Sequence, residues 1–247
     1  MNLQKTFIDF VSKGWRRSLG LSHSRQRPMG QAKEQSLGYF LYRYEDGHGS
    51  FDYAAYKNAQ IAANQAKINK VWATRDNISF MADYLKKNFN TITFGICHGT
   101  RRGLEQLWFR EFLGCEVIGT EISPTANDFP FTIQMDFHDL KPDWIGKADF
   151  VYSNSFDHTY DPKKCLEAWV ATLKPGGVCL LEMASKHGHS GATKTDPFEA
   201  EVFAMPYLIA TWSNGKFGVV EALDVPCIRR KRSVQKVFVV KRAEISV

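Results

Sequence analysis

The sequence predicts an α/β protein whose doubly wound, mostly parallel sheet ends in an antiparallel hairpin. From about residue 90 onward, short runs rich in apolar and β-branched residues alternate with segments of helical periodicity. The last two apolar runs have no helical pattern between them, which predicts that these two strands pair antiparallel. The length of 247 residues and the hydrophobic share of 44% are typical of one full-size globular domain with an extension.

The elements of this α/β region follow from local pattern. Pro162 suits the first turn of a helix, and the glycines at 176 and 177 end that helix in a turn. Strands separated by helices of this length predict parallel pairing with helices on both faces. The predicted strands are 91–97, 116–121, 131–135, 148–153, 178–182, 217–225 and 234–240, and the predicted helices are 104–113, 162–173 and 197–211.

The region before the sheet predicts an N-terminal helical extension. Alanines between residues 54 and 66 favour a helix, and a second helix over 75–87 would bury one apolar face. We therefore divide the chain into three segments. These are a basic N-terminal helix and linker over 1–38, a helical cap over 39–89, and the α/β domain over 90–247.

The formal net charge of +6 is concentrated at the two ends of the chain. Residues 1–33 hold seven Lys or Arg against one acid, Asp9, and a second basic run follows at 229–242. These ends are either solvated tails or surfaces for phosphate, anionic lipid or an acidic partner, so a nucleic-acid partner stays open. The apolar spacing within 3–15 predicts a basic amphipathic helix, which packs on protein, lies on a membrane surface or serves as a transit peptide.

Several classes of protein are excluded by composition. No apolar stretch approaches the roughly 18 residues that span a bilayer, and no secretory signal pattern opens the chain. Five scattered cysteines without a C-x-x-C pair indicate reduced thiols, hence a cytoplasmic location. His187 and His189 form a His-x-His pair, but no third ligand has suitable spacing, so we expect no metal.

A glycine-containing turn between the first predicted strand and its helix points to ligand binding. Such a turn lets a ligand approach main-chain amides at a helix N-terminus, and Glu121, which ends the next strand, can accept hydrogen bonds from ribose hydroxyls. The spacing differs from the dinucleotide pattern G-x-G-x-x-G. Arg101 and Arg102 would attract a phosphate, so the turn alone leaves both a nucleotide and a simple tight connection open.

These motifs, taken in order, make residues 90–242 resemble the class I S-adenosylmethionine-dependent methyltransferases, which have a Rossmann-like sheet. Three short segments carry the resemblance: the family's glycine loop, its acid-x-Ser-Pro segment and the turn before its fifth strand. They correspond here to Gly99-Thr-Arg-Arg-Gly103, Glu121-Ile-Ser-Pro124 and Leu173-Lys-Pro-Gly-Gly177. The resemblance implies that residues 90–247 bind S-adenosyl-L-methionine.

The resemblance also implies roles for individual residues. Glu121 would bind the ribose, and Asp136, with Phe137 beside it, would meet the adenine amino group. The residues implied for cofactor binding are Gly95, Cys97, His98, Gly99, Thr100, Arg101, Gly103, Glu121, Ile122, Asp136, Phe137, Asn154 and Ser155.

Two departures from the family pattern stand out. The first loop lacks the family's acid and its closely spaced glycines, so Cys97, His98 and Arg101 stand in their place. The loop is then expected to bind the cofactor's amino group through main-chain carbonyls. No N/D-P-P-Y/F motif follows the fourth strand, where residues 153–156 stand, and this disfavours methylation of nucleic-acid amino groups.

Methyl transfer from a sulfonium is an in-line displacement that mainly requires alignment of the reacting atoms, with a base where the acceptor must lose a proton. His158 follows the fourth strand, where a base would reach the acceptor, or it is a polar loop residue. Asp157 and Asp161 either orient His158 or cap the helix that follows. Glu182 is either a site residue or a strand-end charge. We predict His158 and Asp157 as the catalytic residues.

The function predicted from the sequence is methyl transfer to an oxygen or nitrogen of a small-molecule acceptor. The alternatives are an RNA methyltransferase and a non-catalytic module that binds the cofactor. The oligomeric state is not predicted. Two segments can form the acceptor pocket: the insertion at 185–203 and an aromatic group that otherwise only fastens the N-terminal region. That group consists of Tyr39, Tyr42, Tyr44, Phe51, Tyr53 and Tyr56.

Overall fold

The structure, a computed structural model, describes residues 33–36, 38–184, 191–228 and 234–243. They belong to a compact unit that spans Ala32–Val247. The predicted amphipathic helix, His187, His189 and the basic residues at 229–232 lie outside the described residues. Within the described residues, no helix combines the length and the apolar character needed to cross a bilayer.

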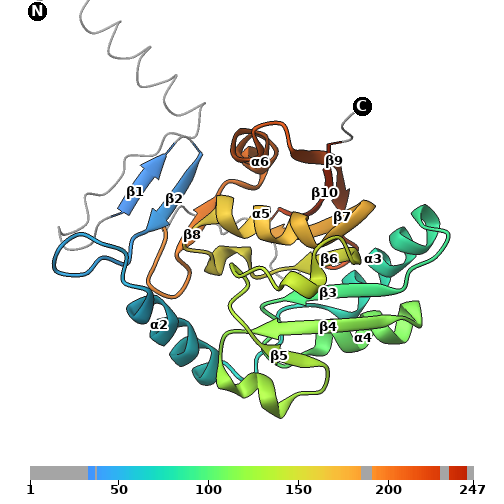
Figure 1. The fold of residues 1–247 in the computed structure, drawn as a ribbon, viewed down its shortest axis with the longest axis horizontal. Coiled ribbons are helices and arrows are strands. Elements are labelled where there is room, and N and C mark those ends of the chain that lie inside the picture. The colour runs from blue at the N-terminus through green and yellow to red at the C-terminus, as the bar shows by residue number, and fades with distance from the viewer. Residues whose placement is uncertain (1–32, 37, 185–190, 229–233, 244–247) are drawn as a thin grey trace, which may run out of the picture. The chain divides into compact units, whose positions relative to one another are not determined.

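A seven-stranded sheet forms the centre of this unit, in the order β5-β4-β3-β6-β7-β10-β9 (Figure 1). The pairs among the first five of these strands are parallel, whereas β10 pairs antiparallel with both β7 and β9. The predicted doubly wound sheet with a C-terminal antiparallel hairpin is therefore confirmed. The strands are β3 (Phe94–His98), β4 (Glu116–Glu121), β5 (Thr132–Gln134), β6 (Ala148–Ser153), β7 (Leu173–Ala184), β9 (Phe217–Asp224) and β10 (Gln235–Arg242).

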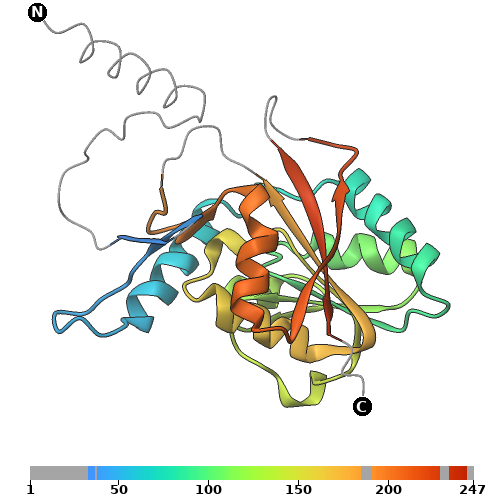
Figure 2. The ribbon, with the colours of Figure 1, turned by 90° about the horizontal axis from the view of Figure 1, so that it is seen from above.

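Helices cover both faces of this sheet (Figure 2). α3 (Arg75–Asn88) and α4 (Leu104–Leu113) pack on one face, where Phe109, Phe150 and Tyr152 are buried among their side chains. α5 (Pro162–Thr172) and α6 (Met205–Ser213) pack on the other. Burial on both faces explains why the central strands β3 and β6 are buried along most of their length instead of alternating between buried and exposed residues.

Local sequence signals set the helix boundaries. The Thr74 side chain caps α3 by accepting from the Asn77 N–H, and Asp161 caps α5 by accepting from the Lys164 N–H. Pro162 follows that cap at the first helical position, as the sequence predicts. Asp161 is therefore a helix cap, which was one of its two predicted roles.

A second, three-stranded sheet was not predicted from the sequence. β2 (Tyr39–Tyr42) pairs antiparallel with β1 (Lys33–Ser36) and with β8 (Phe198–Ala200). The predicted helix over 197–211 is therefore wrong at its start, because residues 198–200 pair with β2 and the α-helix begins only at Met205. This pairing joins segments about 160 residues apart, so no local pattern reveals it.

Two further boundaries differ from prediction. The helical region expected over 50–88 is divided into α2 (Tyr53–Ala66) and α3, because residues 67–74 lie between them without helix. β7 begins at Leu173 and includes the predicted turn, because the register against β6 shifts between Ala148 and Phe150. The remaining elements are short 3-10 helices: η1 (Pro124–Asp128), η2 (Pro142–Trp144), η3 (Phe156–His158) and η4 (Val202–Ala204).

Candidate active site

Two adjoining cavities lie where the parallel strands end. The larger, of about 720 Å³, and the smaller, of about 40 Å³, share Lys67, Arg101, Ser155 and His158 in their walls. Helix α2 supplies one wall of the smaller cavity. Because the carboxyl ends of parallel strands are where open α/β sheets bind ligands, these cavities form the candidate site.

Glu121, at the end of β4, lies in the wall of the smaller cavity beside Ile122. Its carboxylate accepts the main-chain N–H of Arg101 at 3.0 Å through one oxygen and that of Ser123 at 3.0 Å through the other. Each carboxylate oxygen keeps further acceptor capacity. Glu121 thus organises the turn after β3 and still presents acceptor oxygens to a ligand.

The predicted glycine loop divides between cavity wall and core. Gly99 and Arg101 line the smaller cavity. Cys97 is fully buried among the side chains of α3 and α4. Gly95 lies under the Phe150 ring, where an added Cβ would come within 2.2 Å of a ring carbon. No side chain has space at Gly95, so this glycine supports packing of β3 against Phe150.

The other predicted loop residues support the turn and are absent from the described residues that line either cavity. His98 stacks on Trp169 with ring centroids 4.9 Å apart, and its Nδ1 lies 2.8 Å from the Thr120 hydroxyl. Burial lowers the pKa of His98 to about 3, which keeps the ring neutral. Thr100 is buried, and the Gly103 N–H donates to the Thr100 carbonyl at 2.8 Å.

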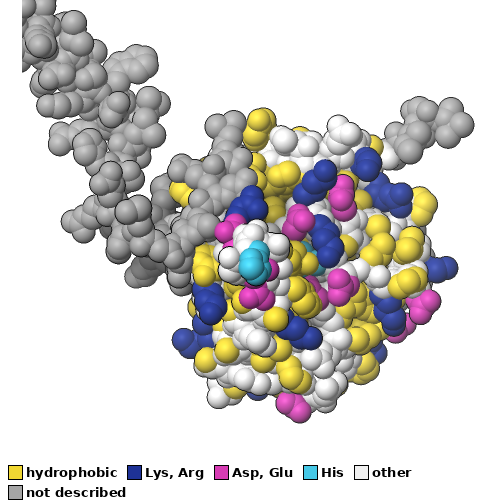
Figure 3. Space-filling model, turned by 60° about the vertical axis from the view of Figure 1, so that its left-hand side comes forward, with side chains coloured by type: hydrophobic (Ala, Val, Ile, Leu, Met, Phe, Trp, Pro, Cys, Tyr) yellow, Lys and Arg dark blue, Asp and Glu magenta, His cyan; other side chains and the backbone are white. Residues whose placement is uncertain are grey.

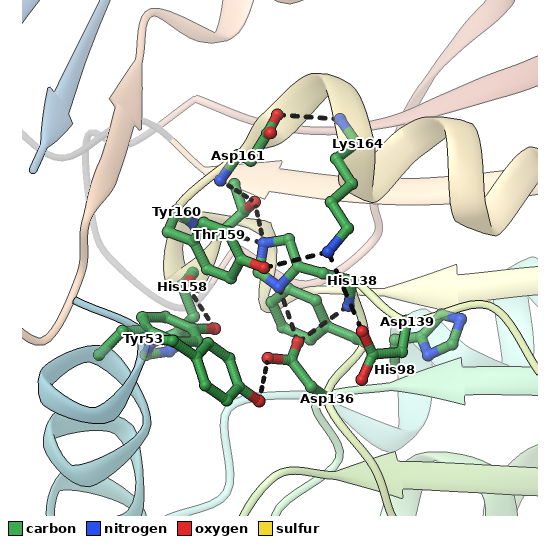
Figure 4. Close-up of polar contacts among 12 residues, drawn as sticks. Tyr53, His98, Asp136, His138, Asp139, His158, Thr159, Tyr160, Asp161 and Lys164 are labelled. Carbon is green, nitrogen blue, oxygen red and sulfur yellow. Dashed lines mark hydrogen bonds and ion pairs between the residues drawn. The ribbon is translucent and has the colours of Figure 1, made fainter. Parts of the chain in front are cut away.

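Asp136 belongs to a buried polar cluster at the edge of the smaller cavity (Figure 4). One of its carboxylate oxygens accepts the Tyr53 hydroxyl at 3.0 Å, and the other accepts the ring Nδ1–H of His138 at 2.7 Å. Burial disfavours the charge on Asp136, but the hydrogen bonds from His138 and Tyr53 outweigh burial and lower the pKa of the carboxyl.

The far side of His138 completes this cluster. Its Nε2 lies 2.6 Å from the Thr159 hydroxyl and accepts the Tyr160 main-chain N–H at 3.3 Å. Sequence reasoning included Asp136 and Phe137 but missed His138, although it follows them directly. The cluster joins the segment after β5 to the segment before α5 and holds the wall that contains Asp136 and Phe137.

Helix α2 closes over the smaller cavity. Its Asn64 side chain accepts the Thr125 hydroxyl at 3.0 Å, and its Tyr56 hydroxyl donates to the His158 carbonyl at 3.2 Å. A volume of about 40 Å³ holds roughly one to three water molecules and no nucleoside. The polar and apolar groups in the wall suit a nucleoside, but the smaller cavity is too narrow for one with α2 in this position.

His158, on η3, faces both cavities. Its Nδ1–H donates to the Thr195 carbonyl at 2.9 Å and lies 3.0 Å from the Gln60 side-chain oxygen. Two acceptors at Nδ1 fix the tautomer, so Nε2 carries the lone pair. Gln60 and Thr195 hold the ring at Nδ1. Asp157 lies on the other side of the ring, with its Oδ1 atom 3.7 Å from Nε2.

Asp196 is a site residue that the sequence did not reveal. It lines the larger cavity, and its carboxylate lies with Asp157 and His158 in a group whose ligand atoms are all within 4.8 Å of one another. No short motif contains all three, because Asp196 comes from the insertion after β7.

The sequence predicts that the acceptor pocket is formed by the insertion at 185–203 or by an aromatic group in the N-terminal region. Residues of the insertion line the larger cavity. None of the six aromatic residues of the other prediction is among the described residues in that wall. Tyr44 and Tyr56 are instead buried against each other, with ring centroids 5.4 Å apart. The described residues of this wall are Lys67, Lys70, Val71, Trp72, Arg101, Asn154, Ser155, Asp157, His158, Glu182, Met183, Ala184, Asp196, Phe198, Glu199, Ala200 and Gln235.

Glu182, on β7, is both a cavity residue and part of a buried network. Its carboxylate accepts the Asn77 amide at 3.0 Å, the Tyr152 hydroxyl at 2.5 Å and the Gln235 amide at 2.5 Å. These three donors come from three different elements. Glu182 therefore ties α3, β6 and β10 together at the floor of the larger cavity.

Comparisons with known proteins agree with this fold. Residues 96–181 match the family model described as a methyltransferase domain. A Burkholderia thailandensis structure, 1,6-didemethyltoxoflavin-N1-methyltransferase with 1,6-didemethyltoxoflavin and S-adenosylhomocysteine bound, is similar with a TM-score of 0.58. Its identity is 13%, over 85% of this chain and 98% of that chain. Comparison with curated proteins found no match.

Two other solved structures share the fold. The glycopeptide N-methyltransferase MtfA complexed with S-adenosylmethionine has a TM-score of 0.51 and 12% identity, over 68% of this chain and 95% of that chain. A putative methyltransferase in complex with the Haloferax volcanii Trm112 activator has a TM-score of 0.51 and 16% identity, over 76% of this chain and 96% of that chain. At these identities the likeness concerns the fold.

The sheet order, the antiparallel last strand and the matched domain define the class of protein: an α/β methyltransferase. More specifically, the fold is that of the class I S-adenosylmethionine-dependent methyltransferases, and residues 96–181 match the methyltransferase-domain model. Its enzyme class is therefore that of transferases that use S-adenosylmethionine as methyl donor.

Proposed function

We propose that the chain transfers a methyl group from S-adenosylmethionine to an oxygen or nitrogen of a small-molecule acceptor that binds in the larger cavity. The observation that carries this proposal is the cavity of about 720 Å³ that adjoins the ends of the parallel strands. Its volume lies in the range of small-molecule sites. Two of the similar structures are, by their names, N-methyltransferases of 1,6-didemethyltoxoflavin and of a glycopeptide.

The smaller cavity is proposed to hold the adenosine part of the cofactor. Glu121 offers carboxylate oxygens to the ribose hydroxyls, and Ile122 and Phe137 offer apolar contacts to the base. Asp136 keeps one hydrogen bond to Tyr53 of α2, so movement of this helix would free an acceptor for the adenine amino group. The chemistry of this wall supports a nucleoside, on condition that α2 opens.

His158 is proposed as the general base. S-adenosylmethionine supplies a methyl group on a positively charged sulfur, and the acceptor must lose a proton when its nucleophile is a hydroxyl or an ammonium. The Nε2 lone pair of His158 would take that proton, leaving an imidazolium. The nearby carboxylates of Asp157 and Asp196 would stabilise this charge. Asn154 and Ser155, which line the same cavity, would position the acceptor.

Two measurements test this function. Isothermal titration calorimetry with S-adenosylhomocysteine should give a single site, and a panel of small hydroxyl and amine acceptors should yield S-adenosylhomocysteine from S-adenosylmethionine. Binding without turnover across the panel would favour the alternative of a non-catalytic cofactor-binding module. The smaller cavity is too narrow to hold a nucleoside as it stands, so this alternative is tested together with the proposed function. Absence of any binding would refute both.

The nucleic-acid alternative has less support from the described surface. On the face over α2 and β2, Lys and Arg side chains are interspersed with acidic and hydrophobic ones, without a continuous basic stripe among the described residues (Figure 3). Single-stranded nucleic acid usually binds in a positively charged groove. The basic ends themselves lie outside the described residues. RNA binding that weakens steeply as salt rises would support this alternative, and absence of RNA binding at low salt would exclude it.

A cytoplasmic location remains our proposal. All five cysteines are free, and three of them, Cys97, Cys165 and Cys179, are buried. Free thiols in this number suit a reducing compartment. Detection of the tagged chain by cell fractionation tests the location directly.

A further inference from the structure

Arg101 adopts a main-chain conformation that arginine rarely takes. Its φ is +45°, in the left-handed region, where side chains other than glycine, asparagine and aspartate are uncommon. The main-chain N–H of Arg101 donates to Glu121, which holds the residue in this conformation. Strained conformations of this kind tend to be kept at functional sites. A glycine would fit this position with less strain, so the side chain itself needs an explanation.

The Arg101 guanidinium lies where the two cavities meet. Arg101 lines both of them, as does Lys67 from the end of α2, so two cations from separate elements converge at this junction. One terminal nitrogen donates to the Lys70 carbonyl at 3.0 Å and anchors the side chain. The Nε atom is buried and has no hydrogen-bond partner among the described residues. A guanidinium with an unused donor beside two cavities is suited to bind an anionic ligand.

The chemistry of the cofactor identifies that anion, and this step rests on the proposed function. S-adenosylmethionine has one anionic group, the carboxylate of its methionyl part. If the adenosine lies in the smaller cavity and the methyl group faces the larger one, the methionyl part leaves the sulfur near their junction. We propose that Arg101, assisted by Lys67, binds the methionyl carboxylate, and that this side chain replaces the loop glycine for that purpose.

The test compares two nucleosides that differ in this carboxylate. S-adenosylhomocysteine carries the amino-acid part, whereas 5′-methylthioadenosine has the same adenosine and a thioether sulfur without it. Calorimetric titration of the Arg101→Gly variant should show affinity for S-adenosylhomocysteine reduced on the order of tenfold or more, with affinity for methylthioadenosine within about twofold. Arg101→Lys should recover part of the loss, because it restores the charge without the planar fork.

Arg102→Gly is the matched control. It removes the same charge from the neighbouring residue, whose guanidinium lies 6.0 Å from the centre of the Phe129 ring, and Arg102 is not in the wall of either cavity among the described residues. This variant should bind both nucleosides as the unmodified chain does. The Arg101→Gly variant should keep or raise its melting temperature, because glycine is favoured at a positive φ.

The outcomes separate the inference from the function on which it rests. Equal loss of both nucleosides, or no loss of S-adenosylhomocysteine, in Arg101→Gly would overturn the carboxylate assignment and leave the proposed function standing. Unchanged affinity for S-adenosylhomocysteine would instead favour an anionic group on the acceptor as the ligand of Arg101. If the unmodified chain binds neither nucleoside, the proposed function and this inference both fail.

Discussion

The ring Nδ1–H of His158 donates to the main-chain carbonyl of Thr195 at 2.9 Å. A main-chain carbonyl accepts but does not donate, so this bond fixes the protonated nitrogen and leaves the lone pair on Nε2. Thr195 belongs to the insertion that lines the larger cavity, next to Asp196. The segment that shapes the acceptor pocket therefore also sets the tautomer of the proposed base.

This relationship predicts the phenotype of His158→Ala. We expect kcat to fall by about 10²- to 10⁴-fold with an acceptor that must lose a proton, because the variant lacks the base. The affinity for S-adenosylhomocysteine should change by less than about threefold. Steady-state kinetics and calorimetry measure the two effects. His48→Ala, in an exposed loop, is the control. Unchanged kcat in His158→Ala would leave His158 as a polar loop residue.

Glu121→Ala should weaken cofactor binding. The change removes the proposed ribose acceptors and leaves the N–H groups of Arg101 and Ser123 without their partner. We expect a loss of about 1–3 kcal/mol in the binding free energy of S-adenosylhomocysteine. Calorimetry gives this value, and Glu121→Gln, which keeps one acceptor oxygen, should lose less. Identical affinity in Glu121→Ala would contradict the ribose assignment.

Weakening the contact between α2 and η1 should favour cofactor binding. The Asn64 side chain accepts the Thr125 hydroxyl and stabilises the position of α2 that narrows the smaller cavity. Asn64→Ala removes this hydrogen bond, so opening should require less free energy. The affinity for S-adenosylhomocysteine should then rise about twofold to tenfold.

Asn58→Ala is the matched control for that variant, since it removes the same side chain from the exposed face of the same helix. It should leave the affinity unchanged. Weaker binding in Asn64→Ala alone would mean that Asn64 contacts the cofactor directly and that α2 is already in its binding position.

The buried carboxyl of Glu105 predicts a pH-dependent stability. Burial raises the pKa of Glu105 from its ordinary 4.5 to about 7. A raised pKa in the folded state means that the neutral form is favoured there. The stability from this group is present below pH 4.5 and is lost as the pH rises through about 7.

Glu105→Gln replaces the carboxyl with a neutral group of similar shape and should remove this dependence. We expect the variant to match the unmodified chain near pH 4.5 and to exceed its free energy of unfolding by about 1–3 kcal/mol at pH 8. Urea denaturation at a series of pH values measures the difference. Glu111→Gln, exposed on the same helix, should show no such trend. A constant difference at all pH values would refute the raised pKa.

Much of the α/β region was predictable because its signals are local. Pro162 after Asp161 marks the start of α5, and runs rich in apolar residues mark strands such as β6, since strands buried on both faces are mostly apolar. Glu121 was predictable because it ends a strand after a glycine-containing turn. The pairing of β2 with β8 was not predictable, since two short segments distant in sequence stabilise each other only in the folded chain.

The sequence by itself determined the chain order of the strands of the seven-stranded sheet, the class of enzyme and the acid at the end of β4. Only the tertiary structure decided that Asp196 and Thr195 meet His158, that Phe150 leaves no space for a side chain at Gly95 and that α2 covers the smaller cavity. The physical reason is that periodicity and capping act over a few residues. Contacts between side chains from separate elements depend instead on how the whole sheet and its helices pack.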